Sequence, residues 1–170
     1  KHTWKGAGGT LERTALLEEL PSAATQKLLA LLKPEQRKIA TELLGYPKQS
    51  IGRRMTPHYV AIQQNWTVAE VLSHLRTQED KRDTIAQLYV VDAKSHLVDY
   101  VRLRNVVVAP IQMSVLELLE NQRIFLRATD DQQTPVVAFN KYDVTILPVV
   151  DSKEVLVGVV TVDDVLDVAE

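Results

Sequence analysis

Hydrophobic positions in the first part of the chain recur with the spacing of helices. Before residue 46, apolar residues recur at the three- and four-residue spacings of a helix face: Leu28, Leu29, Leu31, Leu32, Ile39, Leu43 and Leu44. Pro21 and Pro34 suit the first turn of a helix, and Gly45 suits the end of one. We therefore expect two or three short consecutive helices in residues 10–45, too few to bury both of their faces.

From Met55 onward the pattern changes to short strands alternating with helices. The apolar runs are four to seven residues long and are separated by polar turns such as AKSH (93–96). They predict a strand within TPHYVAIQQNW (56–66), an amphipathic helix over 68–76 with Thr67 as its cap, strands over 88–92 and 97–103, and a helix over 104–109.

The last part of the chain repeats this pattern. LYVVDAKSHLVDYVRLRNVV (88–107) aligns without a gap with LPVVDSKEVLVGVVTVDDVL (147–166), and a helical stretch precedes each copy, at 68–76 and at 134–143. Two copies of a unit about 60 residues long are too few and too long for a solenoid. They predict a duplicated α/β motif whose copies pair about a pseudo-twofold axis.

Composition and charge narrow the classes of function. Apolar residues make up 45% and charged residues 25%, as in ordinary globular domains. The chain has no cysteine, which excludes disulfides and thiolate chemistry. The net charge of −2 is uneven: residues 130–170 carry nine acids against two lysines, a charge of −7 that leaves +5 for residues 1–129. This acidic part favours cations and makes nucleic acid a poor partner.

Two further classes find no support in the sequence. It contains neither a Gly-rich phosphate loop nor a nucleophile–base motif, so we do not expect an enzyme. No apolar run reaches the roughly 18–20 residues that span a bilayer, and no signal peptide is visible.

The repeated motif ends in Gly158-Val-Val-Thr161-Val-Asp163-Asp164, and this tandem pattern resembles a pair of CBS domains. The phrases RRMTPHYVAIQQNWTVAEVL, KYDVTILPVVD and GVVTVDDVLDV resemble the cytosolic region of MgtE-type magnesium transporters. The resemblance implies an α/β fold, a tandem CBS domain pair of two β-α-β-β-α repeats preceded by a short α-helical segment. We divide the chain into a frayed terminus or artificial extension (1–9), a helical segment that ends an N-terminal helical domain (10–50), and CBS repeats over 51–112 and 113–170.

The resemblance implies a magnesium sensor. In this family the cytosolic domains form a homodimer through their CBS pairs, and Mg²⁺ in acidic clefts holds the dimer compact and the transmembrane pore closed. We therefore expect a soluble fragment of a longer protein, a regulatory domain at the cytoplasmic face of the cell membrane. Mg²⁺ takes oxygen ligands and needs only one or two carboxylates per site, so it can favour one of two states by binding it better.

Six acidic residues are candidate magnesium ligands: Asp131, Asp143, Asp163, Asp164, Asp167 and Glu170. Matched to the family motif, four of them, all but Asp163 and Glu170, fall on its magnesium-binding aspartates. Beside Asp131 the family places a second acid, where this chain has Gln133. For Asp163 the alternative is a helix cap, because acids near a helix start interact favourably with its dipole.

An adenosine nucleotide, ATP or AMP, is the alternative ligand, and a nucleotide-sensing CBS module of another protein is the alternative function. Some members of the resembled family bind ATP through an Arg-Asp pair at the end of the first repeat and an upstream aromatic residue. Arg104 is retained here, but other positions of the pattern differ: Asp99 for the glycine, Arg102 for the serine or threonine, Asn105 for the aspartate and Gln87 for the aromatic residue. Asn105 can still hydrogen-bond a ribose, without a charge, so Arg104 and Asn105 are the nucleotide-binding candidates of the first repeat. Thr161 of the second repeat either contacts the nucleotide or caps a helix. A dimerisation scaffold without a ligand is the third possibility.

Overall fold

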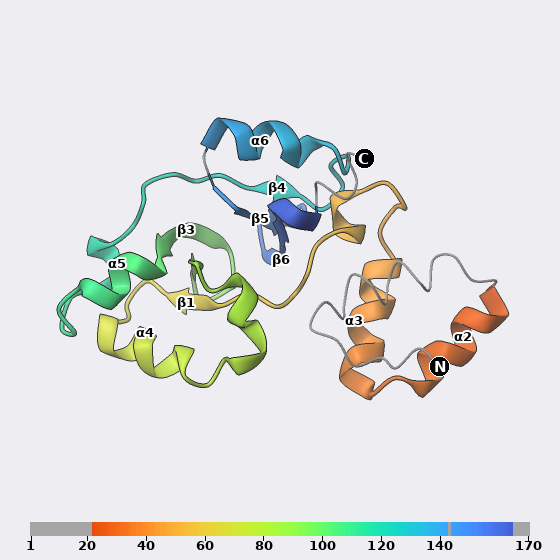
Figure 1. The fold of residues 1–170 in the computed structure, drawn as a ribbon, viewed down its shortest axis with the longest axis horizontal. Coiled ribbons are helices and arrows are strands. Elements are labelled where there is room, and N and C mark those ends of the chain that lie inside the picture. Colours follow the sequence, from red (N-terminus) through yellow and green to blue (C-terminus); the bar gives the residue numbers. More distant parts are fainter. Residues whose placement is uncertain (1–21, 143, 165–170) are drawn as a thin grey trace.

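The structure is a computed structural model that describes residues 22–142 and 144–164. Two helices come first, followed by two β-rich units that lie side by side (Figure 1). In chain order the elements are α2 (Ser22–Leu31), α3 (Pro34–Leu44), η1 (Ile51–Arg53), β1 (Ala61–Gln63), α4 (Val68–Leu75), η2 (Glu79–Thr84), β2 (Gln87–Val91), β3 (Leu97–Arg102), α5 (Leu103–Val108), η3 (Val115–Glu117), β4 (Leu126–Arg127), α6 (Thr134–Tyr142), β5 (Ile146–Val150) and β6 (Leu156–Thr161). Among the described helices none is long and apolar enough to cross a membrane.

The two N-terminal helices confirm the expectation for residues 22–45, whereas residues 10–21 lie outside the described part. Pro34 opens α3, where its missing N–H costs nothing. Gly45 follows the last turn as predicted, but with a φ of −72° it keeps a right-handed conformation rather than the left-handed one that favours glycine. The guanidinium of Arg37 reaches back to the end of α2 and donates to the carbonyl oxygens of Leu29, Ala30 and Leu32.

Thr67 caps α4, as the sequence predicts, and together with Glu70 it forms a capping box. The hydroxyl of Thr67 accepts a hydrogen bond from the backbone N–H of Glu70 (3.3 Å), and the Glu70 carboxylate accepts one from the backbone N–H of Thr67 (3.2 Å). Val68 and Val71 are fully buried on the inner face of the helix, beneath the first sheet.

Each repeat forms its own three-stranded sheet, with strand orders β1-β2-β3 and β4-β5-β6. In both sheets the first strand is parallel to the second and the second is antiparallel to the third. The bulge between Val90 and Val91 recurs between Val149 and Val150, 59 residues later. The predicted duplication is therefore confirmed down to the strand register.

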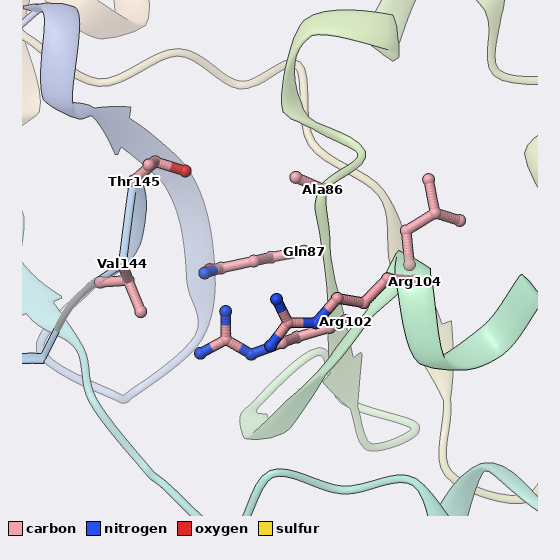
Figure 2. A pocket seen from close by; sticks show the side chains of 7 residues that line it. Ala86, Gln87, Arg102, Arg104, Val144 and Thr145 are labelled. Atoms are coloured by element: carbon pink, nitrogen blue, oxygen red, sulfur yellow. The ribbon is translucent and has the colours of Figure 1, made fainter.

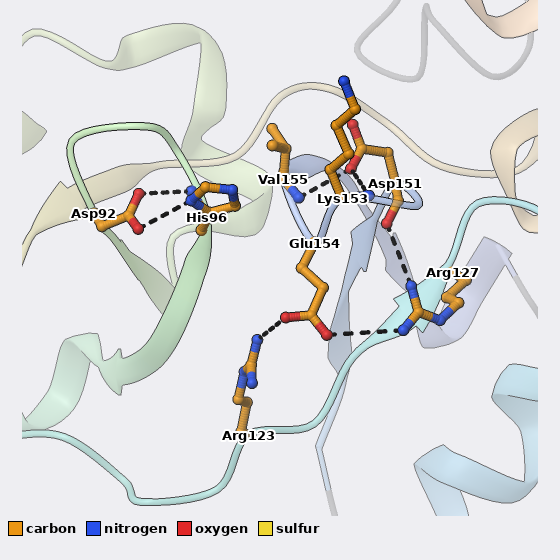
Figure 3. Close-up of polar contacts among 8 residues, drawn as sticks. All are labelled: Asp92, His96, Arg123, Arg127, Asp151, Lys153, Glu154 and Val155. Carbon is orange, nitrogen blue, oxygen red and sulfur yellow. Dashed lines mark hydrogen bonds and ion pairs between the residues drawn. The ribbon is translucent and has the colours of Figure 1, made fainter.

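The turns between the paired strands of the two repeats meet at the pseudo-twofold axis (Figure 3). The N–H of Leu97 donates to the carbonyl oxygen of Glu154 (3.2 Å), and the N–H of Leu156 donates to that of Ser95 (3.0 Å). These bonds are related by the same offset of 59 residues. Ser95 and Glu154 both have positive φ, 67° and 64°, which closes each turn. A shared core then lies between the sheets: Tyr89, Val91, Leu97, Tyr100, Ile146, Val150, Leu156 and Val159.

One expected strand is shorter than its pattern suggests. Within residues 56–66 only Ala61–Gln63 form a strand. Thr56 instead exchanges two backbone hydrogen bonds with Val159 in the second repeat, at 2.8 and 2.9 Å. The alternation therefore reflects contacts with two different sheets.

Candidate functional site

A pocket of about 310 Å³ lies between the two repeats. The first repeat contributes the start of β2, the end of β3 and the start of α5, and the second contributes the residues that lead into β5. Its walls are formed by Ala86, Gln87, Arg102, Leu103, Arg104, Val144 and Thr145. This volume is at the low end of the range of about 300–1,000 Å³ that ligand pockets occupy.

Gln87 is the buried polar side chain of this pocket, with 4% of its surface exposed. The Tyr89 hydroxyl donates a hydrogen bond to Gln87 Oε1 at 3.0 Å. Burial raises the pKa of Tyr89, so that this hydroxyl stays protonated. Because Oε1 is occupied, the other end of the amide, Nε2, faces the pocket as a donor (Figure 2).

The two arginines of the pocket differ in their partners. Arg102 Nε lies 3.4 Å from Glu120 Oε1, and Asn105 Nδ2 donates to the same oxygen at 3.2 Å. Arg104 is exposed, and its guanidinium extends with that of Arg102 toward Val144 and Thr145 (Figure 2). Of the three residues predicted to hold a nucleotide, two belong to the first repeat: Arg104 lines the pocket, whereas the amide of Asn105 is turned to Glu120.

Three of the six predicted magnesium ligands lie in the described residues: Asp131, Asp163 and Asp164. Asp131 Oδ1 accepts a hydrogen bond from the N–H of Gln133 (2.9 Å) directly before α6. The side chain of Asp163 is exposed. Asp143, Asp167 and Glu170 lie outside the described residues, and the metal-binding role of all six stays a prediction.

The helix that follows β6 is capped by Thr161. Its hydroxyl accepts from the backbone N–H of Asp164 (3.4 Å) and donates to Asp164 Oδ2 (2.7 Å). Thr161 and not Asp163 is therefore the capping residue, because the helix already begins at Val162. Asp163 lies in the first turn, where the helix dipole still favours an acid. Thr161 is not among the residues that line the pocket, so its position favours the capping interpretation over a nucleotide contact.

The acids within residues 22–142 and 144–164 do not form a closed metal cage. In these ranges no group of three or more acidic or histidine side chains is arranged to hold a metal ion. Mg²⁺ keeps several waters and binds through one or two carboxylates, commonly from facing elements. Asp131 before α6 and Asp163 with Asp164 after β6 provide single carboxylates of that kind.

Five positions of the pocket region were not singled out from the sequence: Glu120 and the wall residues Ala86, Leu103, Val144 and Thr145. The repeat contained a signal for Thr145, since the offset of 59 residues aligns it with Ala86. The structure bears out this equivalence: Ala86 O accepts from Leu103 N–H (3.1 Å), and Thr145 O accepts from Val162 N–H (2.9 Å). Glu120 carried no such signal, because it is distant in sequence from Arg102 and Asn105.

Comparison with known proteins agrees with this architecture. Residues 10–49 match the family model of the MgtE intracellular N domain, and residues 49–112 and 103–170 match that of the CBS domain. The chain therefore belongs to the CBS domain family. The order of an MgtE N domain followed by a CBS pair confirms the resemblance to the cytosolic region of MgtE-type magnesium transporters.

Individual relatives are similar over most of this chain. The magnesium transporter MgtE of Thermus thermophilus is 41% identical over 145 residues, 85% of this chain and 32% of that protein. The chain thus spans about a third of the length of this curated relative. Two solved structures have a TM-score of 0.89. The soluble part of a magnesium transporter is 34% identical and matches over 94% of this chain and 62% of its own. The cytosolic domain of the Mg²⁺ channel MgtE in complex with ATP is 36% identical, and the match covers 96% of this chain and 66% of that chain.

Proposed function

We propose that this chain is a magnesium-sensing regulatory domain of a magnesium transporter, at the cytoplasmic face of the membrane that holds the pore. One observation carries the proposal: acidic residues begin where a largely buried strand ends. Val159 and Val160 of β6 are inaccessible to solvent, and Asp163 and Asp164 follow them within four residues. Asp167 extends this acidic stretch along the sequence.

The electrostatics of this part of the chain support a cation as the regulatory ligand. Residues 130–170 carry a net charge of −7. Carboxylates that a compact arrangement brings together repel one another, and a bound divalent cation turns this repulsion into attraction. A compact state would then be favoured only while Mg²⁺ is bound, which is the behaviour of a two-state sensor. The names of the relatives, a magnesium transporter and a Mg²⁺ channel, support magnesium as the cation.

A homodimer through the CBS pairs is the assembly that such a sensor would tighten. An apolar surface on and after α5 supports it: Val107, Val108, Ile111 and Leu116 are 63, 80, 56 and 55% exposed. Large exposed side chains of this type concentrate at protein interfaces. We expect Val108→Glu to shift the chain from dimer to monomer in sedimentation velocity. Val137→Glu, at a 71% exposed position on α6, is the matched control. A wild-type chain that stays monomeric with Mg²⁺ would contradict this assembly.

Thermal unfolding with and without millimolar Mg²⁺ tests the sensor itself. Mg²⁺ should raise the midpoint of the wild-type chain, because a ligand at one hundred times its Kd stabilises the folded state by about 2.7 kcal/mol. The Asp164→Asn/Asp167→Asn variant should lose this effect. Glu79→Gln/Asp83→Asn removes two exposed acids of η2 and should retain it. An equal Mg²⁺ response in all three proteins would reject the acidic stretch as the sensor.

The pocket between the repeats favours a second candidate function, a nucleotide-responsive CBS module. If ATP or AMP raised the midpoint while Mg²⁺ had no effect, this function would replace the first. If neither ligand raised it, the domain would be a scaffold for assembly.

A further inference from the structure

The pocket between the repeats offers hydrogen-bond donors and positive charge. Gln87 Nε2 faces into it from a side chain that is 4% exposed, and none of the described residues accepts a hydrogen bond from it. A buried donor without a partner costs roughly 1–3 kcal/mol unless a ligand or water accepts from it. Arg102 and Arg104 add two guanidinium groups on the same side of the pocket (Figure 2). Glu120 lies 3.4 Å from Nε of Arg102, so Arg104 provides the uncompensated positive charge.

The described lining contains no group that selects a nucleoside. None of its seven residues is aromatic, so a base would meet only aliphatic walls such as Leu103 and Val144. None of them is acidic, so a carboxylate acceptor for ribose hydroxyls is missing from the lining. Asn105, which stands where a ribose-binding aspartate would be expected, donates its amide to Glu120 instead.

Positive charge at this place is specific to the first repeat. The offset of 59 residues aligns Arg102 with Thr161 and Arg104 with Asp163. The same backbone positions thus carry guanidinium groups in one repeat and a hydroxyl and a carboxylate in the other. Guanidinium groups bind phosphate oxygens through paired charge-assisted hydrogen bonds, whereas an aliphatic wall adds contact area without distinguishing one base from another.

We infer that this pocket recognises a chain of phosphate groups and not the adenosine of a nucleotide, so that it binds inorganic triphosphate and every nucleoside triphosphate with similar affinity. Gln87, Arg102 and Arg104 hold the phosphate oxygens. The inference concerns the pocket alone and holds whichever ligand the acidic stretch after β6 takes.

Isothermal titration calorimetry on the whole chain, at constant ionic strength and without Mg²⁺, tests it. The titrants are inorganic triphosphate, ATP, GTP, CTP and adenosine. We expect the four triphosphates to bind within about threefold of one another and adenosine not to bind. The exposed side chain of Arg104 permits Arg104→Gln without loss of folding, and this variant should weaken all four by about tenfold, or 1.4 kcal/mol. Arg82→Gln, at an exposed arginine of η2, should bind as the wild type does.

A variant that should gain selectivity provides a test that does not depend on a loss of binding. Gln87→Phe supplies the missing ring, and base stacking should then favour ATP and GTP over inorganic triphosphate by roughly fivefold or more. Three outcomes would overturn the inference: ATP preferred more than tenfold over GTP and inorganic triphosphate by the wild type, binding of adenosine, or no binding of any triphosphate. Equal weakening by Arg104→Gln and Arg82→Gln would also overturn it, because attraction would then be general and not located in the pocket.

Discussion

Gly158, in the second repeat, lies against the side chain of Met55, near the start of the first repeat. A Cβ atom at Gly158 would be 2.7 Å from the Met55 sulfur and 2.9 Å from its Cγ. Met55 is 4% exposed and belongs to the core that joins the helical segment to the second repeat. The glycine is therefore needed for close packing, because the space of its side chain is filled from another part of the chain.

Gly158→Ala should lower the free energy of unfolding by about 1–3 kcal/mol, the usual cost of overpacking a filled core. The urea midpoint measures this change. In the Met55→Ala background the added methyl has room, so the same substitution should cost much less, as a double-mutant cycle would show. Gly45→Ala is the matched control, since Gly45 has an ordinary helical φ of −72°. Equal effects in both backgrounds would contradict the packing argument.

Asp99 occupies the position in the first repeat that Gly158 has in the second. It is 7% exposed, and its carboxylate accepts from the N–H of Tyr100 (2.7 Å) and of Asn121 (2.9 Å). The carboxylate thereby ties the connection between the repeats to β3. Asp99→Gly leaves both donors without this acceptor and should cost about 1–3 kcal/mol. Asp99→Asn keeps one acceptor and should cost less in the same urea titration. If Asp99→Gly left the free energy of unfolding unchanged, water would have to replace the carboxylate as the acceptor.

Arg37→Ala should loosen the end of α2, because three carbonyl oxygens lose their donor. We expect a loss of about 1 kcal/mol, as for hydrogen bonds at a partly exposed site. Hydrogen exchange of the amides in α2 should speed up more than that in β2. Lys38→Ala, the neighbouring exposed position, should leave both rates unchanged. Uniform acceleration in both elements would indicate global rather than local destabilisation.

Asp92 makes stability depend on acidic pH. The backbone N–H of His96 donates to its carboxylate and is the main cause of a pKa below the usual 3.8, with further help from the N–H of Lys94 and the imidazole of His96 (Figure 3). Desolvation acts in the opposite direction and is second in size only to the hydrogen bond from the His96 N–H, but the net effect lowers the pKa. Since the folded state favours the ionised form, this contribution is complete above pH 3.8 and is lost as pH falls through the lower, folded-state pKa.

Asp92→Asn should therefore be less stable than the wild type at pH 6, and the difference should shrink below pH 3.8. Guanidinium unfolding at pH 6, 4 and 3 measures it. Asp80→Asn, at an exposed position of η2, is the control. A difference that stays constant with pH would exclude the ionised carboxylate as its source.

Local signals in the sequence were sufficient for the elements and for the duplication. Thr67 with Glu70 caps α4 wherever that helix packs, since a capping box needs only residues three apart. Asp92 and Asp151 each accept hydrogen bonds from N–H groups two and four residues further on, so the turns close alike in both repeats. The metal-ligand and nucleotide roles of the acidic and Arg104 positions came from the family resemblance and stay predictions.

The sequence by itself thus determined most of the strands and helix starts, the repeat and the acidic end of the chain, because each depends on neighbours a few residues apart. Only the tertiary structure decided which side chains meet. It places Glu120 against Arg102 and Asn105, turns Gln87 Nε2 into the pocket by occupying its oxygen with Tyr89, and sets Met55 against Gly158. Apart from the link between Gln87 and Tyr89, these contacts join residues from distant segments, and the direction of a buried amide depends on every neighbour at once. No local pattern encodes such contacts, since they exist only after the two sheets have packed together.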